Sequence, residues 1–239
     1  MTARTESHTS SMHLRLLGCF RFAIDGQRVE IPAVSARVIA YLGVRGNEVE
    51  RNVVAKDLWP NASRSRSLGN LRSALWRLSA CARNAVSESG SKILLNPEVR
   101  CDLRLIERAV MSTSSLGIAD VMTWGWCDEL LAGWYDDWVL TAREAFQVRR
   151  AHALERLSSV SCAAGFARDA LVYATLAVSA QPMRESAYQA LLRAHIGRGN
   201  RLEALQLYGQ LVVMLERELD VAPSAETVAI VASLDAEVA

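Results

Sequence analysis

The stretch RSRSLGNLRSALWRL, residues 64–78, decides the fold of the N-terminal half of this chain. Its apolar residues recur with the period of an α-helix and form one stripe that must face a core. That stripe consists of Leu68, Leu71, Leu75 and Leu78. The opposite side carries Arg66, Asn70, Ser73 and Arg77, with Gly69 beside them. The pattern predicts a helix with one buried face and one polar face.

The polar face of this helix carries charge of one sign. No Asp or Glu occurs between residues 58 and 87. Like charges on a helix repel, whereas opposite charges one turn apart stabilise it, so a basic face is unfavourable unless a polyanion offsets it. We therefore favour a nucleic-acid-facing helix over an ordinary solvated one.

The residue types on this face match the chemistry of DNA. Arginine can chelate guanine and asparagine can pair with adenine, while serine and arginine bind phosphate oxygens. We assign Arg66 and Arg77 to the groove, Arg64 to a phosphate and Arg72 to the flank, and Gly69 would let the backbone approach closely. The predicted DNA contacts are Arg64, Arg66, Ser67, Asn70, Ser73 and Arg77, joined by Arg51, Lys56 and Lys92 from neighbouring elements.

The segments around this helix predict a winged helix-turn-helix. Asp25-Gly26 lies between two alternating apolar runs, which is the strongest short-range signal for a hairpin. Helical spacing follows in residues 33–44 and 51–59. After the basic helix, residues 86–103 carry the turn signals Ser-Gly and Asn-Pro around an apolar run, as a second hairpin would.

Composition and charge restrict the class of protein. Apolar residues make up 51% and charged residues 22%, which is typical of a soluble globular chain. The five cysteines are scattered without a CxxC pair, which predicts reduced thiols and no zinc site. With neither a signal peptide nor an apolar run long enough to span a bilayer, the sequence predicts a cytoplasmic protein with no membrane partner.

The net charge of +1 conceals an asymmetry between the two halves. Residues 1–110 contain 17 lysines and arginines against 10 acids, and residues 111–239 contain 10 against 16. Such a division favours a nucleic-acid partner for the first half and a different role for the second.

The second half is helical and contains an internal repeat. A shift of 34 residues aligns Ala153 with Ala187, Gly165 with Gly199 and Ala170 with Ala204. This period belongs to tetratricopeptide repeats, in which small residues lie where two antiparallel helices touch. Such units need neighbours, so we expect the tryptophan-rich segment around residues 124–138 to supply the missing one.

The motifs quoted above resemble the Streptomyces antibiotic regulatory protein (SARP) family in its short form. The stretches LRLLGCFRFAIDGQRVEI, NVVAKDLWP and RSLGNLRSALWRL resemble its OmpR-type winged helix. Much of residues 129–227 is similar to its bacterial transcriptional activation domain, including Arg184-Glu185 and the run Leu215–Leu219. The resemblance implies an activator that binds direct repeats near a promoter as a homodimer and recruits RNA polymerase holoenzyme, usually for a secondary-metabolite (antibiotic) gene cluster.

We thus expect a mostly α protein with a small β component: a tail over residues 1–12, a winged-helix DNA-binding domain over 13–103, and a tetratricopeptide-like activation domain over 104–239. By the resemblance, the loop with Trp59, Pro60, Asn61 and Ser63 contacts polymerase. No motif indicates an enzyme, a cofactor or a metal site. Two alternatives stay open: an interaction adaptor that uses the repeats, and a regulator gated by an unknown small-molecule effector.

Overall fold

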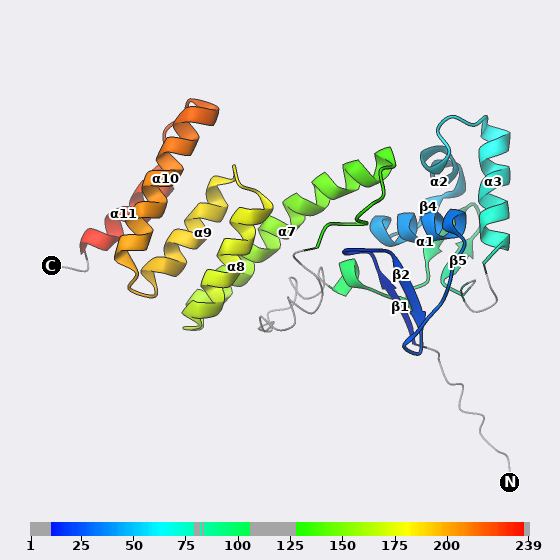
Figure 1. The fold of residues 1–239 in the computed structure, drawn as a ribbon, viewed down its shortest axis with the longest axis horizontal. Coiled ribbons are helices and arrows are strands. Elements are labelled where there is room, and N and C mark those ends of the chain that lie inside the picture. Colours follow the sequence, from blue (N-terminus) through cyan, green and yellow to red (C-terminus); the bar gives the residue numbers. More distant parts are fainter. Residues whose placement is uncertain (1–10, 79–81, 83, 106–127, 237–239) are drawn as a thin grey trace, which may run out of the picture. The chain divides into compact units, whose positions relative to one another are not determined.

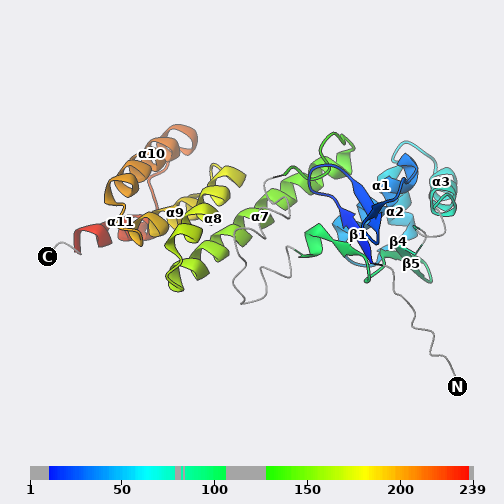
Figure 2. The same ribbon diagram turned by 60° about the horizontal axis from the view of Figure 1, so that its bottom comes forward.

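The fold is that of a computed structural model, which describes residues 11–78, 82, 84–105 and 128–236. The chain divides into two compact units (Figures 1 and 2). The first contains residues up to Arg108 together with Asp128–Ala142, and the second contains Ala109–Cys127 and Arg143–Ala239. The domain boundary at residue 103 stays a prediction. Trp124 and Trp126 of the predicted tryptophan-rich segment lie outside the described residues.

The first unit opens with a small four-stranded sheet in the order β3-β2-β1-β7. Its strands are β1 (Met12–Arg15), β2 (Arg21–Ile24), β3 (Gln27–Arg28) and β7 (Arg100–Cys101). The turn between β2 and β3 is Asp25-Gly26, and both residues have positive φ, at 50° and 79°. That geometry is what a two-residue hairpin requires, so the predicted hairpin is confirmed. β1 begins inside the predicted tail, because Met12 is buried in the core.

Three helices and a second sheet complete the winged helix-turn-helix. The helices are α1 (Ala33–Arg45), α2 (Arg51–Leu58) and α3 (Arg64–Trp76). The second sheet has the order β4-β6-β5, with β4 at Val49–Glu50, β5 at Val86–Ser89 and β6 at Lys92–Leu95. β5 and β6 pair antiparallel across a turn at Gly90, so the predicted wing hairpin is confirmed.

The segment before α7 (Asp137–Ala163) belongs to the first unit. Leu131 donates its amide to the carbonyl of Leu16 at 2.7 Å, and Gly18 donates its amide to Glu129 at 2.8 Å. Trp138 packs edge-on against Tyr41 with ring centroids 5.3 Å apart. Trp134 and Trp138 therefore extend the winged-helix core. The helix that they lead into supplies the first helix of the repeat stack, because α7 belongs to the second unit from Arg143 on.

The second unit is a stack of antiparallel helices (Figure 1). After the remainder of α7 come α8 (Ala167–Ala180), α9 (Glu185–Ile196), α10 (Arg201–Leu219) and α11 (Ala225–Ala236). The repeat-related pairs Ala153 and Ala187, and Ala170 and Ala204, are all buried. Gly165 and Gly199 have φ of 79° and 72° and lie in the turns after α7 and α9, in the left-handed conformation that glycine favours. The predicted repeat is confirmed.

Polar bonds at repeat-related positions join successive units of the stack. Glu155 accepts hydrogen bonds from Arg184 Nε at 2.6 Å and from Ser186 Oγ at 2.9 Å. Gln189, one repeat further on, donates to Thr227 Oγ1 at 3.0 Å. Each bond links the first helix of one unit to the start of the next, which fixes the spacing of the stack.

The carboxylate of Asp102 binds backbone amides at the end of β1. Asp102 is 9% exposed, and one of its carboxylate oxygens accepts the amides of Leu16 and Leu17, both at 2.8 Å. The other oxygen accepts the amide of Leu103 at 2.8 Å. Burial raises the pKa of Asp102, against the lowering effect of these amides. The side chain thus ties the sheet to the segment that leaves the second hairpin.

We predict that Asp102→Ala destabilises the first unit by about 3 kcal/mol, because three amide donors lose their acceptor in a buried site. Urea unfolding followed by tryptophan fluorescence measures this, since Trp59, Trp76, Trp134 and Trp138 all lie in the first unit. Exposed Glu98 provides the control, and Glu98→Ala should change stability by less than about 0.5 kcal/mol. Equal effects of the two substitutions would contradict this role for Asp102.

Candidate nucleic-acid interface

The packing of α3 against the winged-helix core determines which of its side chains face outward. Its buried residues are Ser67, Leu71 and Ala74, and Leu78 just beyond the helix is also buried. Ser35 of α1 donates its hydroxyl to the carbonyl of Ala74 at 2.7 Å, and Ser35 itself is fully buried. Small side chains at this crossing let the two helices approach closely. The leucines at 68 and 75, expected in the core, are only half-buried.

The buried face is therefore rotated by about 50° from the one that the leucines alone predict. Ser67 was a candidate DNA contact, but it is 4% exposed and its hydroxyl donates to the carbonyl of Arg64 at 3.0 Å. This burial removes its side chain from the outward face. Sequence reasoning missed the change because serine and alanine at 67 and 74 carry no hydrophobic signal.

The other candidates on α3 are open to solvent to different degrees. Those that are exposed are Arg64, Arg66, Ser73 and Arg77, and Asn70 is half-buried. Arg72 and Trp76, which the sequence placed at the flank, are also exposed, and Trp76 is 77% exposed. Within the described part of the chain, no acid forms an ion pair with any of these four arginines. Uncompensated positive charge thus covers the outward face of α3.

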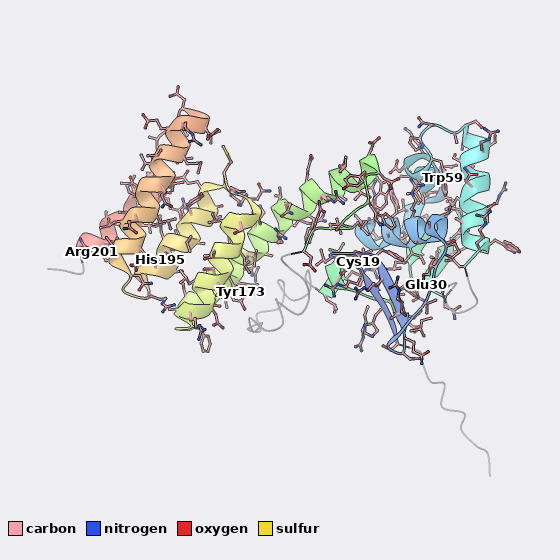
Figure 3. All side chains as sticks on the ribbon, viewed as in Figure 1. Cys19, Glu30, Trp59, Tyr173, His195 and Arg201 are labelled. Carbon is pink, nitrogen blue, oxygen red and sulfur yellow. The ribbon has the colours of Figure 1, made fainter. Side chains whose placement is uncertain are left out.

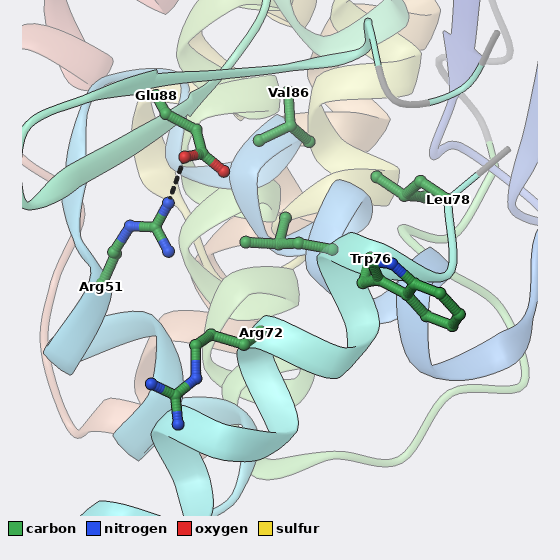
Figure 4. Close-up of a pocket in the computed structure, with 7 residues that line it drawn as sticks. Arg51, Arg72, Trp76, Leu78, Val86 and Glu88 are labelled. Atoms are coloured by element: carbon green, nitrogen blue, oxygen red, sulfur yellow. Dashed lines mark ion pairs between the residues drawn. The ribbon is translucent and has the colours of Figure 1, made fainter. Parts of the chain in front are cut away.

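The basic candidates outside α3 differ in how they are held. Arg51 at the start of α2 pairs with Glu88 of β5 at 2.5 Å, across a shallow groove beside α3 (Figure 4). Lys92 at the start of β6 pairs with Glu48 at 3.6 Å. Lys56 is exposed without an ion-pair partner among the described residues. Glu88 and Glu48 therefore neutralise the charges of Arg51 and Lys92, whereas the arginines of α3 keep their full positive charge.

The turn between α2 and α3 forms one wall of a groove of about 500 Å³. Of the predicted polymerase contacts in this turn, Pro60, Asn61 and Ser63 are exposed and Trp59 is half-buried (Figure 3). The facing wall comes from residues 135–138, including Tyr135, which is 78% exposed. This second wall was not predicted from the sequence, because nothing local to residues 135–138 reveals that they fold back onto the winged helix.

A partly exposed polar cluster around the buried Tyr41 connects α1 to α2, and its Asp57 also lines this groove. Tyr41 donates its hydroxyl to Asp57 Oδ2 at 2.5 Å, and Arg45 binds the same carboxylate oxygen at 3.0 Å. Burial, together with the bond to Asp57, raises the pKa of Tyr41 to about 12. The hydroxyl therefore stays protonated at neutral pH and acts as a donor. The cluster fixes the position of α2, and with it the turn that leads into α3.

The described residues show neither a metal centre nor a membrane span. Within them, no three His, Cys, Asp or Glu side chains gather as a cation site would require. None of the described helices combines the length and the apolar character needed to cross a bilayer.

Comparison with known proteins supplies a family for the second unit and a fold for the whole chain. Residues 124–234 match the family model described as "Bacterial transcriptional activator domain". Among solved structures, the chain is similar to Mycobacterium tuberculosis EmbR in complex with a low affinity phosphopeptide, with a TM-score of 0.76 and 18% identity. That match covers 95% of this chain and 66% of the other, so this chain spans just under two thirds of its length. No curated protein matches the sequence significantly.

We predict that Tyr41→Phe destabilises the first unit by about 2 kcal/mol, because Asp57 loses a buried hydrogen bond. Urea unfolding at pH 7 measures the change. Tyr188→Phe is the matched control, since the half-buried hydroxyl of Tyr188 has no hydrogen-bond partner among the described residues. A loss no larger than that of the control would show that the cluster does not hold α2.

Proposed function

We propose that this chain is a transcriptional activator of the SARP type, which binds specific duplex DNA through α3 and recruits RNA polymerase holoenzyme. The match of residues 124–234 to the model of a bacterial transcriptional activator domain supports the activator role. The winged helix provides the DNA contact through α3 and its neighbours, and its turn at residues 59–63 provides the polymerase contact.

One observation carries the DNA-binding proposal: the outward face of α3 is basic and uncompensated. Arg64, Arg66, Arg72 and Arg77 are exposed, and no acid is present on this helix. Phosphate binding releases counterions and supplies sequence-independent affinity, whereas side chains in the groove supply specificity. Arg66 and Arg77 are proposed for base edges, with Asn70 and Ser73 between them. Arg64, at the N-terminus of α3, is proposed for a phosphate.

The neighbouring elements are proposed for positioning on the duplex. Lys56 of α2 is exposed and suited to a backbone phosphate. Arg51 and Lys92 form ion pairs with Glu88 and Glu48. To bind a phosphate of DNA, each must loosen or break its ion pair. We therefore expect Arg51 and Lys92 to contribute less to DNA affinity than the arginines of α3.

The activation proposal rests on the groove between the turn at 59–63 and residues 135–138. Pro60 and Asn61 protrude from one wall and Tyr135 from the other, as a docking site for a protein segment would. The resemblance to OmpR-type domains supports polymerase as the partner. It also supports direct-repeat operators, a homodimer on them, a secondary-metabolite gene cluster as the target and a cytoplasmic location.

We predict that Arg66→Ala and Arg77→Ala each weaken binding to a selected duplex by about tenfold and make the dependence of log affinity on log salt less steep by about one. Gel shift at several salt concentrations measures both quantities. Arg168→Ala removes the same charge from an exposed position on α8 and should change neither. If wild-type affinity for DNA does not fall as salt rises, the adaptor function takes precedence over this proposal.

We predict that Asn61→Ala, alone or with Pro60→Ala, preserves duplex binding but reduces activated transcription several-fold, because both side chains are exposed at the turn and not on α3. A reconstituted transcription assay with bacterial RNA polymerase, read beside a gel shift on the same promoter, separates the two effects. Parallel loss of both activities would assign the turn to DNA instead.

A further inference from the structure

Building on the proposed DNA binding, we propose that α3 reads bases with a second strip as well, Ser65, Gly69, Arg72 and Trp76, which lies beside the positions proposed above. In this strip Gly69 is the point where the helix backbone approaches the base edges, Arg72 reads a guanine and Trp76 contacts the methyl group of a thymine. Along one side of this strip lie the residues predicted from the sequence, which are Arg66, Asn70, Ser73 and Arg77.

The buried face of α3 establishes the direction of this strip. Ser67, Leu71 and Ala74 point into the core. At about 100° per residue, the direction opposite their mean is occupied by Gly69 and Trp76, with Ser65 and then Arg72 next to them on one side. The four positions are spaced i, i+4, i+7 and i+11, so they form one continuous line along the helix.

Gly69 has no structural reason within the protein to be glycine. Glycine destabilises a helix interior relative to alanine. A Cβ at Gly69 would meet nothing within 4 Å, whereas one at Gly43 of α1 would lie 2.9 Å from the side chains of Leu14 and Leu16. Packing therefore accounts for Gly43 but not for Gly69. A glycine kept on an open face, in line with the exposed arginine and tryptophan, is suited to a ligand that comes close to the helix backbone.

Trp76 presents a large apolar surface in the same direction. It is 77% exposed, and its ring points away from Val86 and from the shallow groove (Figure 4). The major groove offers one apolar feature at base edges, the C5-methyl group of thymine. Because the ring of Trp76 is mostly exposed in the free protein, its burial against that methyl group would stabilise the complex with DNA.

Arg72 lies one turn before Trp76 and keeps its guanidinium for a ligand. The carboxylate nearest to it in the shallow groove, that of Glu88, is paired with Arg51 at 2.5 Å (Figure 4). Arginine is the usual side chain for bidentate contact with guanine O6 and N7. Four residues of helix advance about 6 Å, slightly less than two base steps, so the guanine and the thymine should lie within two base pairs of each other.

The decisive experiment compares Gly69→Ala with Gly209→Ala in the full chain. Gly209 lies exposed within α10, and a Cβ there would also meet nothing within 4 Å. Both substitutions should raise the melting temperature by about 2–4 °C, because alanine favours the helix. Only Gly69→Ala should weaken binding to a single-site duplex selected from a random library, by about tenfold. Stabilisation with loss of affinity excludes misfolding as the cause.

A second measurement tests Trp76 through the DNA. Replacing the contacted thymine by deoxyuridine removes only the methyl group and should lower wild-type affinity by about fivefold, and it should leave the affinity of Trp76→Ala unchanged. If wild-type protein binds the selected duplex but Gly69→Ala binds equally well, or deoxyuridine affects both proteins alike, the strip is wrong while DNA binding stands. If wild-type protein selects no duplex, the proposed function fails and the strip fails with it.

Discussion

The contact between α1 and α3 determines what the first unit can present to a partner. Ser35 is fully buried and donates to the carbonyl of Ala74, and Ala74 and Ser67 lie on the same buried face. Because these side chains are small, the helices approach closely, and any rotation of α3 would push a larger side chain into the contact. The outward direction of every arginine on α3 follows from this packing.

Other parts of the first unit support that arrangement from behind. The Tyr41–Asp57–Arg45 cluster joins α1 to α2, and α2 leads through a short turn into α3. On the sheet side, Asp102 binds the amides of Leu16 and Leu17, while Leu131 binds the Leu16 carbonyl. The end of β1 thus receives partners from two later segments of the chain. Residues Asp128–Ala142, although distant in sequence, therefore form part of the winged-helix core.

The success of sequence reasoning here depended on how local each signal was. Asp25-Gly26 was predictable because only a few residue types tolerate two successive positive φ angles, and Gly165 and Gly199 were predictable because the repeat places them at equivalent turns. The face of α3 was predicted only in part. Leucine spacing gave the helix but not its rotation, which depends on the small residues opposite α1. The roles of Asp102 and Trp138 rest mainly on Leu16, Leu17 and Tyr41, which lie 85 or more positions away in the sequence, and no local pattern encodes those partners.

The charge of this chain acts locally rather than through its total. With a formal net charge of +1, the protein as a whole has little long-range attraction for a polyanion. Arg51 of α2 is paired with Glu88, and Lys92 of the wing with Glu48, whereas among the described residues the arginines of α3 and Lys56 have no ion-pair partner. Phosphate neutralisation would therefore come from about five side chains on two adjacent helices. A salt slope of about −4 to −5 follows, modest enough that contacts at base edges must supply much of the affinity for a specific site.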